Sequence, residues 1–194
     1  MRVVNSVRQI GSRLAAMSAQ LASDISGFAA VEFAMIVPVM IMMLLGCVEV
    51  CDALNLQNRV STIAETASLL VARCSSVSRG DLADVMRISD SIMGKYSEQA
   101  LKIEIVAVQT DAANTTTVLF SQDRSGGEPY GAGSTYPKLP QGVIAQNHAG
   151  IIADVTYAYR SPFGQYIHGT ILVHDNLAQV TRDATITLGA QCVY

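Results

Sequence analysis

A long apolar run extends from Phe28 to Val50 and contains two charged residues, Glu32 and Glu49. The other positions are mainly Met, Leu, Ile, Val and Ala. A helix rises about 1.5 Å per residue, so a run of this length reaches about 35 Å and can cross a bilayer core of about 30 Å. The pattern predicts a transmembrane helix over residues 28–50. Pro38 should kink this helix, which helices in a bilayer tolerate.

Beyond Val50 the apolar positions keep a helical spacing. They recur at steps of three and four, at Ala53, Leu56, Val60, Ile63, Ala67, Leu70 and Cys74. Neither Gly nor Pro interrupts the stretch from Cys47 to Arg73. The simplest interpretation is one helix from about Phe28 to Arg73, which leaves the membrane and becomes amphipathic over residues 51–73.

A second, shorter helix is predicted after the turn SSVSRGD (75–81). Ser78 or Asp81 can cap its N-terminus, because both side chains can accept a hydrogen bond from free backbone N–H groups. The helix would carry Leu82, Val85, Met86, Ser89, Ile92 and Met93.

The pattern then changes to that of β-strands. Four strands are predicted, at LKIEIVAV (101–108), TTTVLFS (115–121), IIADVTYAY (151–159) and AQVTRDATITL (178–188). Residues 122–142 hold five glycines and three prolines and read as a long surface loop, and SPFGQ (161–165) opens the connection before the fourth strand. The order of elements predicts an α+β fold, in which a four-stranded antiparallel sheet packs on the second half of the long helix.

The residues before the apolar run predict a basic leader peptide, 1–27. Apolar positions Val3, Val4, Val7, Ile10, Leu14, Met17 and Leu21 form a helical stripe, which is typical of a short amphipathic helix on a membrane surface. A disordered leader with fortuitous spacing is the alternative.

The distribution of charge predicts the orientation of the chain in the membrane. The leader holds Arg2, Arg8 and Arg13 against Asp24, a balance of +2. The net charge of the whole chain is −3, so residues 28–194 carry a charge of −5. Positive charge before a span stays in the cytoplasm, so the acidic head, 51–194, is expected to be exported. An acidic exported body gives no reason to expect nucleic-acid binding.

Four cysteines fall into two pairs. Cys74 and Cys192 lie in the exported part, where an oxidising compartment makes a disulfide between them plausible, although two free thiols are the alternative. Cys47 and Cys51 lie one helical turn apart and are interpreted as small apolar packing residues.

The charge of Glu32 needs an explanation, because intramembrane ionisable groups usually have a partner. If the chain were cut after Gly27, Phe28 would gain an α-amine one helical turn before Glu32, on the same face of the helix. The helix dipole also favours an anion in a first turn. The new amine, of the same subunit or of a neighbour in a helix bundle, would then be the partner.

This arrangement resembles the class III signal of type IV pilins, in which a prepilin peptidase cuts after a glycine and a Glu follows at the fifth mature position. GFAAVEF (27–33) looks like the form found in Flp (type IVc, Tad) pilins. AAVEFAMIVPVMIMML (29–44) is similar to the TadE-like pseudopilins, which share an A-V-E-F-A-hydrophobic-P core, and VTYAYRSPF (155–163) extends the resemblance weakly. The leader departs from the pattern at Asp24 and Ser26, where a basic residue is often found.

The resemblance implies a pilin-like fold and a minor pseudopilin, not an enzyme, that helps to assemble or initiate a Tad pilus for surface attachment. It implies cleavage between Gly27 and Phe28, and assembly through Glu32, Phe33 and Pro38. The implied partners are the prepilin peptidase, companion pseudopilins, the Flp major pilin, an inner-membrane platform protein and membrane lipid. The chain would cross the bacterial inner membrane once, with its head in the periplasm, and would either remain there or enter the pilus.

Other interpretations have weaker support. LLGC (44–47) mimics a lipoprotein cleavage box, but a helix continues after it without a flexible tether. His148, His168 and His174 match no strong zinc spacing, so surface or strand-edge positions are expected, with no metal and no cofactor. A tethered hydrolase would need a nucleophile and base, which no motif supplies. An uncut, membrane-anchored adhesive or ligand-binding module, with loop 122–142 as its contact surface, is the main alternative.

Overall fold

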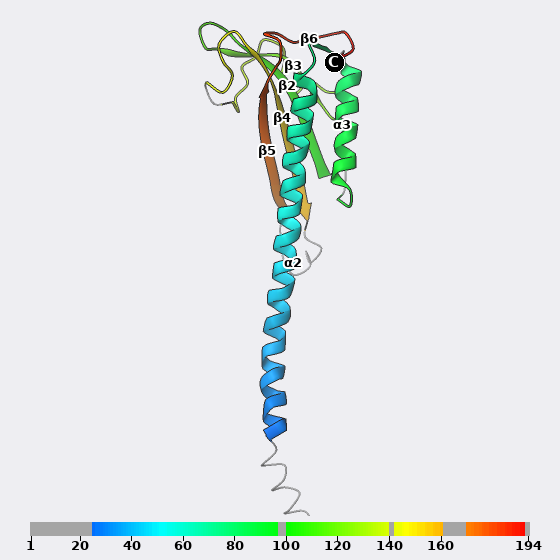
Figure 1. Ribbon diagram of the computed structural model, residues 1–194, viewed down its shortest axis with the longest axis vertical. Helices are drawn as coiled ribbons and strands as arrows, with labels where there is room; N and C mark the ends of the chain where they lie inside the picture. Colours follow the sequence, from blue (N-terminus) through cyan, green and yellow to red (C-terminus); the bar gives the residue numbers. More distant parts are fainter. Residues whose placement is uncertain (1–24, 97–99, 140–141, 161–169, 193–194) are drawn as a thin grey trace, which may run out of the picture. The chain divides into compact units, whose positions relative to one another are not determined.

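The computed structural model describes residues 25–96, 100–139, 142–160 and 170–192 (Figure 1). The chain divides into two compact units, Met1–Val50 and Cys51–Tyr194. The predicted leader, 1–27, lies outside the described residues except for its last three, and so do SPFGQ (161–165) and His168.

Helix α2, Ile25–Ala72, is one uninterrupted helix of 48 residues, as the spacing of the apolar positions predicts. It begins three residues before Phe28 and continues on both sides of Pro38. In the second unit, one face of the helix is fully buried, and this face holds Leu56, Val60, Ile63, Ala64, Ala67 and Val71. The predicted amphipathic extension is therefore confirmed.

Helix α3, Arg79–Met93, begins with a capping box. Ser78 is the N-cap, its hydroxyl accepts a hydrogen bond from the Asp81 N–H, and the Asp81 carboxylate accepts one from the Ser78 N–H at 2.9 Å. Two backbone donors that the helix cannot use are thereby satisfied. The buried face holds Leu82, Val85, Met86, Ser89 and Met93, as the sequence predicts, and Gly94 ends the helix with a positive φ of 60°.

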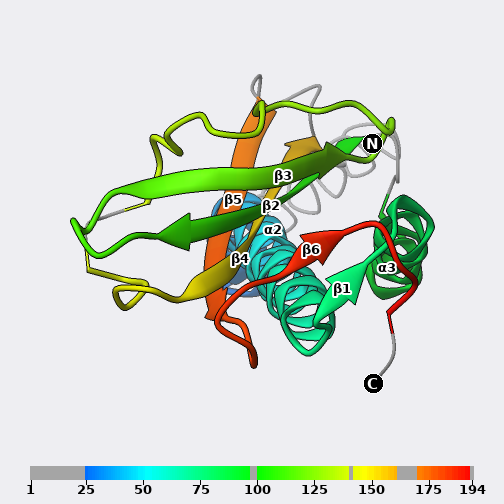
Figure 2. The same ribbon diagram turned by 90° about the horizontal axis from the view of Figure 1, so that it is seen from above.

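The main sheet has four antiparallel strands in the order β3-β2-β4-β5. They are β2 (Leu101–Thr110), β3 (Thr116–Asp123), β4 (Ala149–Arg160) and β5 (Thr170–Val180). The α+β fold class with its four-stranded antiparallel sheet is confirmed. Figure 2 shows the twist that accumulates from β3 to β5, in keeping with the fixed hand of strand twist.

The predicted position of the fourth strand is wrong. The sequence places it at 178–188, whereas β5 ends at Val180 and begins at Thr170, in a segment that the sequence analysis left to connection and turns. All eleven residues of β5 pair with β4, from Arg160↔Thr170 to Gly150↔Val180. Immediately after the strand, the Thr181 N–H and hydroxyl both donate to the Ala149 carbonyl, which turns the chain away from the sheet.

The segment predicted as the end of that strand forms a different pairing. Only β6, Thr187–Leu188, is extended, and it pairs in parallel with β1, Ser76–Val77, which precedes α3. The short two-stranded sheet lies beside the end of α2 and the start of α3 (Figure 2). It brings the C-terminal segment next to the turn that joins the two helices.

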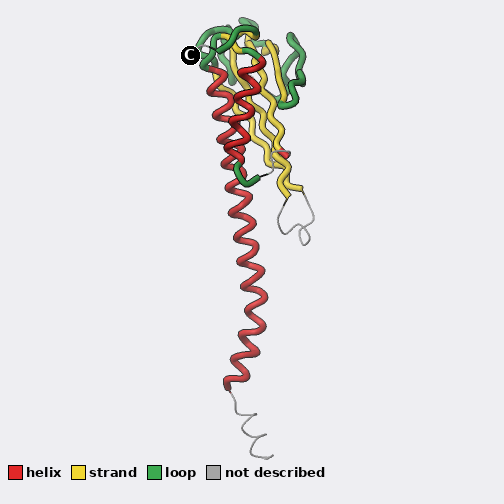
Figure 3. The backbone as a smooth tube through the Cα atoms, turned by 90° about the vertical axis from the view of Figure 1, so that its right-hand side faces the viewer, coloured by secondary structure: helices red, strands yellow, loops and turns green. Residues whose placement is uncertain are grey.

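The two faces of the main sheet are covered differently. Figure 3 shows the helices along one face and the long loop after β3 along the other. The helix face carries the larger core, to which the strands contribute residues such as Ile103, Ile105, Ile151 and Val155. The outer face has a smaller core, formed by Val106, Val108, Val118, Ile144 and Ile152 with Tyr136 of the loop.

Candidate membrane and assembly segment

The first unit exposes a continuous apolar helix surface. Large side chains that are at least 60% exposed include Phe28, Val31, Phe33, Met35, Met40, Met42, Met43 and Leu44. Among the described residues, α2 is the one helix that is long and apolar enough to cross a membrane. A soluble protein rarely exposes so large an apolar surface, so this segment requires lipid or other helices around it.

Gly27 has no structural reason to be glycine. It lies in the first turn of α2 without a positive φ, and a Cβ added there would meet no atom within 4 Å. Glycine inside a helix costs up to about 1 kcal/mol relative to alanine, and here no packing contact offsets that cost. The described residues therefore give no packing reason for glycine at this position.

Glu32 lies one helical turn after Phe28, as the sequence predicts for one continuous helix. Its side chain is exposed, and it makes no hydrogen bond or ion pair with any residue that the structure describes. Phe33 beside it is 66% exposed. The carboxylate is therefore available to a partner outside the described residues.

Pro38 is also exposed and lies inside the helix. Proline has no N–H, so the carbonyl of Ala34, one turn earlier, lacks its usual helical donor. Gly46 resembles Gly27 in that a Cβ would meet nothing within 4 Å. Small residues in spanning helices commonly let a second helix approach closely.

A disulfide and a hydrogen bond join the C-terminal segment to the end of α2 and the start of α3. Cys74, buried just after α2, forms a disulfide with Cys192, with Cα atoms 5.4 Å apart. The Cys192 N–H donates to the Asp81 carboxylate at 2.8 Å. The Ser78 N–H and hydroxyl donate to the same oxygen at 2.9 Å, and these bonds hold the pKa of Asp81 below its usual 3.8. The Asp81 carboxylate thus binds both the N-cap of α3 and the C-terminal segment at Cys192.

Replacing Asp81 with alanine is expected to lower the free energy of unfolding of the head at pH 7. Because the folded chain lowers the pKa of Asp81, its stabilisation is fully present above about pH 4 and is lost as the pH falls through the lowered value. Urea unfolding of wild type and Asp81→Ala, at pH 7 and at a pH below the lowered pKa, measures the difference in the free energy of unfolding between the two proteins. Asp84→Ala, which removes an exposed carboxylate paired with Arg87, is the matched control and should have a smaller effect. A difference that stays constant as the pH falls would contradict the assignment to the Asp81 charge.

A second polar cluster joins the long loop to the outer face of the sheet. Asp154 on β4 is 3% exposed, and its carboxylate binds Lys138 Nζ of the loop and lies 3.2 Å from His174 Nε2 on β5. The hydrogen bond to Asp154 raises the pKa of Lys138 above its usual value. Burial and the Asp154 charge raise the pKa of Tyr136 to about 12, and the Tyr136 hydroxyl accepts a hydrogen bond from Asn176. These contacts hold the loop on the sheet.

The two histidines that the structure describes, His148 and His174, lie at different places on the head. His174 lies on the edge strand β5, and His148 is exposed with Nδ1 2.9 Å from the Gln146 carbonyl, so both occupy surface or strand-edge positions as the sequence analysis expects. Among the described residues no group of three His, Cys, Asp or Glu side chains could hold a metal ion. No metal role is therefore assigned to His148 or His174.

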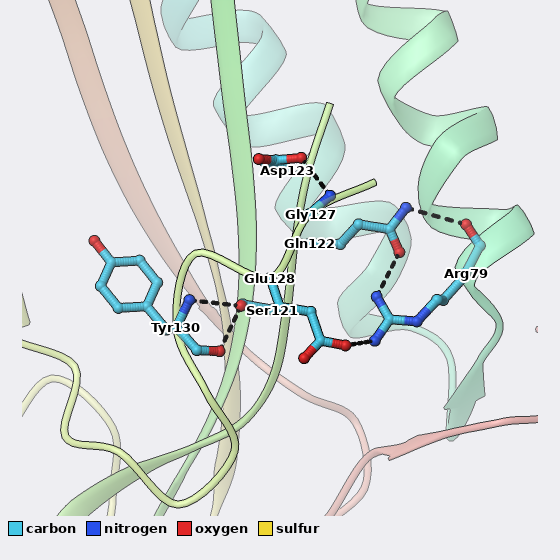
Figure 4. A network of polar contacts seen from close by, with 7 residues as sticks. All are labelled: Arg79, Ser121, Gln122, Asp123, Gly127, Glu128 and Tyr130. Carbon is cyan, nitrogen blue, oxygen red and sulfur yellow. Dashed lines mark hydrogen bonds and ion pairs between the residues drawn. The ribbon is translucent and has the colours of Figure 1, made fainter. Parts of the chain in front are cut away.

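Loop 122–142, the candidate contact surface, is bound to the head at its start (Figure 4). The Ser121 hydroxyl donates to the Tyr130 carbonyl at 2.7 Å and accepts from the Tyr130 N–H at 3.0 Å. The Ser125 hydroxyl and the Gly127 N–H each donate to the Asp123 carboxylate at 2.7 Å, and these bonds lower the pKa of Asp123. The first part of the loop is therefore held by local turns.

Arg79 adds a longer-range contact, also drawn in Figure 4. Its guanidinium pairs with Glu128 of the loop and donates to the Gln122 side chain of β3, while the Gln122 amide donates to the Arg79 carbonyl at 3.3 Å. The start of α3, the end of β3 and the loop are thereby joined. Sequence reasoning missed this network and the Asp154 cluster, because every link connects residues far apart in the chain.

Over the described residues, these features define a class of protein: an α+β head that follows one helix long and apolar enough to anchor it in a membrane. A comparison with protein families identifies part of it more closely. Residues 27–68 match the family model of TadE-like proteins, and the match begins at Gly27 and ends inside α2. No curated protein and no solved structure matches the chain.

The predicted TadE-like resemblance is therefore confirmed over the anchor and most of the helix extension. The TadE-like family is associated with Tad pilus systems. The match does not extend to α3 or the sheet.

Proposed function

We propose that the chain is a minor pseudopilin that helps to assemble or initiate a Tad (Flp, type IVc) pilus, and so contributes to surface attachment. It acts as a building block and not as an enzyme. The observation that carries the proposal is that the TadE-like match starts at Gly27, a helical glycine for which the fold gives no reason.

In this function a prepilin peptidase removes residues 1–27. The bond to be cut lies near the start of the described part of α2. Cleavage makes Phe28 the N-terminus and gives Glu32 a cationic partner one turn away. The exposed apolar surface then packs beside the helices of companion pseudopilins and of the Flp major pilin, with an inner-membrane platform protein as the assembly base.

The proposed location is the inner membrane, with the N-terminus in the cytoplasm and the head in the periplasm. Arg2, Arg8 and Arg13 before the span support this orientation. The Cys74–Cys192 disulfide also supports it, because structural disulfides persist in oxidising compartments such as the periplasm.

The alternative is an uncut, anchored adhesive module with loop 122–142 as its contact surface. The bonds from Ser121, Asp123 and Arg79 hold the first part of that loop on the head. They give the alternative no specific support.

The N-terminus of the mature protein tests the proposal. In cells that carry the peptidase, the wild-type chain is expected to begin at Phe28, and Gly27→Leu is expected to keep the leader and to form no pilus. Gly46→Leu is the matched control, because Gly46 is also a helical glycine without close neighbours, and its leader should be removed normally. Sequencing or intact mass of the membrane-extracted protein gives the answer. A Gly27→Leu chain that begins at Phe28 would exclude this class of peptidase.

A further inference from the structure

The first half of β5 exposes apolar side chains on both faces of the strand. Val173 and Leu177 pack with the larger core on the helix face, and Ala178 packs against the smaller core on the outer face. Successive side chains of a strand alternate between its faces, so Ile171 lies on the helix face and Leu172 on the outer face. Ile171 is 53% exposed and Leu172 is 69% exposed. Neither core therefore covers this end of β5.

The backbone of β5 also has an edge that faces away from the sheet, because β5 is the last strand in the sheet order, next to β4 (Figure 1). In an antiparallel pair, residues whose N–H and C=O groups face the partner strand alternate with residues whose groups face away. The Thr181 N–H donates to the Ala149 carbonyl of β4, and the pairing has no register shift, so the odd-numbered residues of β5 face β4. The N–H and C=O groups of Thr170, Leu172 and His174 therefore face away from the sheet.

A side chain satisfies the next outward donor along the strand. The Asn176 N–H donates to the Asp175 carboxylate at 2.9 Å, which agrees with an outward direction of the even-numbered donors. Among the described residues, no acceptor takes the N–H of Thr170, Leu172 or His174. The segment Thr170–His174 is called the open edge below. It contains no proline, lysine or bulge, which are devices that commonly block the edge of a sheet.

The opposite edge of the sheet, at β3, is covered by the chain itself. The Val118 N–H donates to the Ser134 carbonyl at 2.8 Å, and the Val118 carbonyl accepts from the Gly133 N–H at 2.7 Å. Thr117 and Thr135 form an antiparallel bridge beside these bonds. The long loop thus adds a short extended segment to β3, whereas no described segment does the same for β5.

We propose that an extended strand of a partner protein adds to the open edge of β5. Such a strand supplies both acceptors and donors for the outward backbone groups. Its own side chains alternate between the two faces, so it covers Ile171 and Leu172 at the same time, whereas a surface laid on one face would cover only one of them. This interaction goes beyond the proposed function, which assigns assembly to the anchor.

Charge limits the kind of strand that fits. The open edge contains no Asp, Glu, Lys or Arg, so the residues opposite Ile171 and Leu172 are expected to be uncharged and apolar. A second copy of β5 fits less well. Antiparallel pairing of two complete β5 strands, Thr170–Val180, places Asp175 opposite Asp175 of the other copy, and like charges directly opposite each other are destabilising.

Photo-crosslinking from both faces of β5 tests the proposal. In cells that produce the full chain, p-benzoylphenylalanine replaces Ile171 or Leu172 in turn. Both positions are expected to crosslink to one extended segment of the same partner, identified by mass spectrometry of the joined peptides. Ile88 on α3, 47% exposed, is the matched control and should not crosslink to that segment. Capture from only one of the two β5 positions would overturn strand addition in favour of contact with one face, and capture from neither would show that the edge is unoccupied.

A backbone substitution tests the pairing itself. Thr170→Pro removes an outward N–H that the sheet does not use, at the first residue of a strand, where proline is tolerated. It is expected to abolish both crosslinks, whereas Thr170→Val, which keeps the N–H, should retain them. Equal thermal unfolding midpoints of the two variants and wild type show that the heads are folded. Crosslinks that persist in a folded Thr170→Pro chain would contradict backbone pairing.

The same cells separate this proposal from the proposed function, because the mature N-terminus and pilus formation are measured beside the crosslinks. Crosslinks from both faces in a chain that keeps its leader and forms no pilus would leave strand addition intact and contradict the proposed function. Normal cleavage and pili without crosslinks would do the reverse. A joined peptide that comes from β5 itself would overturn the partner strand in favour of a second copy of the chain.

Discussion

Glu32→Ala is expected to insert into the membrane and to lose its leader as the wild type does, and then to form no pilus. Insertion should be unaffected or improved, because removing a charge makes the span more apolar. The Glu32 side chain is exposed and bonds to no described residue, so its removal breaks no such contact within the subunit. The expected defect therefore arises after cleavage, when the α-amine of Phe28 near the hydrocarbon boundary has lost its counter-charge.

Two further variants separate charge from size. Glu32→Gln keeps the shape of the side chain without its charge and should fail as Glu32→Ala does. Glu32→Asp keeps the charge on a shorter side chain and should retain part of the assembly. Membrane fractionation, leader removal and pilus formation are measured on each variant. Normal pili from Glu32→Ala would show that the glutamate is a tolerated boundary residue, and loss of insertion would show that it acts at an earlier step.

The helices could be predicted from the sequence because local rules determine them. Leu56, Val60, Ile63 and Ala67 of the predicted series lie on the buried face of α2, whereas Ala53 and Leu70 are half-buried and Cys74 follows the end of the helix. Ser78 with Asp81 forms the capping box that their spacing indicates. The strands β2, β3 and β4 begin and end within a few residues of the predicted ranges. In these segments the local pattern and the tertiary environment favour the same structure.

The fourth strand could not be predicted because pairing with β4 overrides the local signal. Asp175 and Asn176 are typical turn residues, yet they lie in the middle of β5. The Asn176 N–H bonds to the Asp175 carboxylate at 2.9 Å, so this donor is satisfied without another strand, which an edge position allows. The alternating pattern at 178–188 is strand-like, but the turn at Thr181 interrupts it.

The contacts of the head were beyond sequence reasoning for a similar reason. Asp81 bonds the N–H of Cys192, 111 residues away, and Lys138, Asp154 and His174 come from a loop and two strands. No spacing rule connects such residues, because their distance depends on the finished sheet. The relative position of Gly27 and Glu32 in the anchor could be predicted, because the two residues are close in sequence and a helix alone defines their geometry.

Removing the disulfide is expected to have the largest effect on the stability of the head. Replacing Cys74 and Cys192 with serine should lower the free energy of unfolding by about 2–5 kcal/mol, because the bond closes a long loop and restricts the unfolded chain. Cys74 and Cys192 are 118 residues apart, so the loop includes α3 and the whole main sheet. A serine at position 74 can donate to the Leu70 carbonyl, which lies 3.5 Å from the Cys74 sulfur, so the new hydroxyl is not left without a partner.

The paired variant Cys47→Ser and Cys51→Ser is the matched control, since both thiols are free and exposed on the anchor side of α2. It should leave unfolding of the head unchanged. Urea unfolding of the detergent-solubilised full chain, with and without reductant, measures the effect, and reductant should destabilise the wild type but not the Cys74→Ser, Cys192→Ser chain. A peptide map after alkylation without reductant should recover the two cysteines as one linked pair. Recovery of alkylated Cys74 from protein exported by the cell would show that the bond does not form there, and the C-terminal segment would then be held by the Asp81 contacts and the β1–β6 pairing.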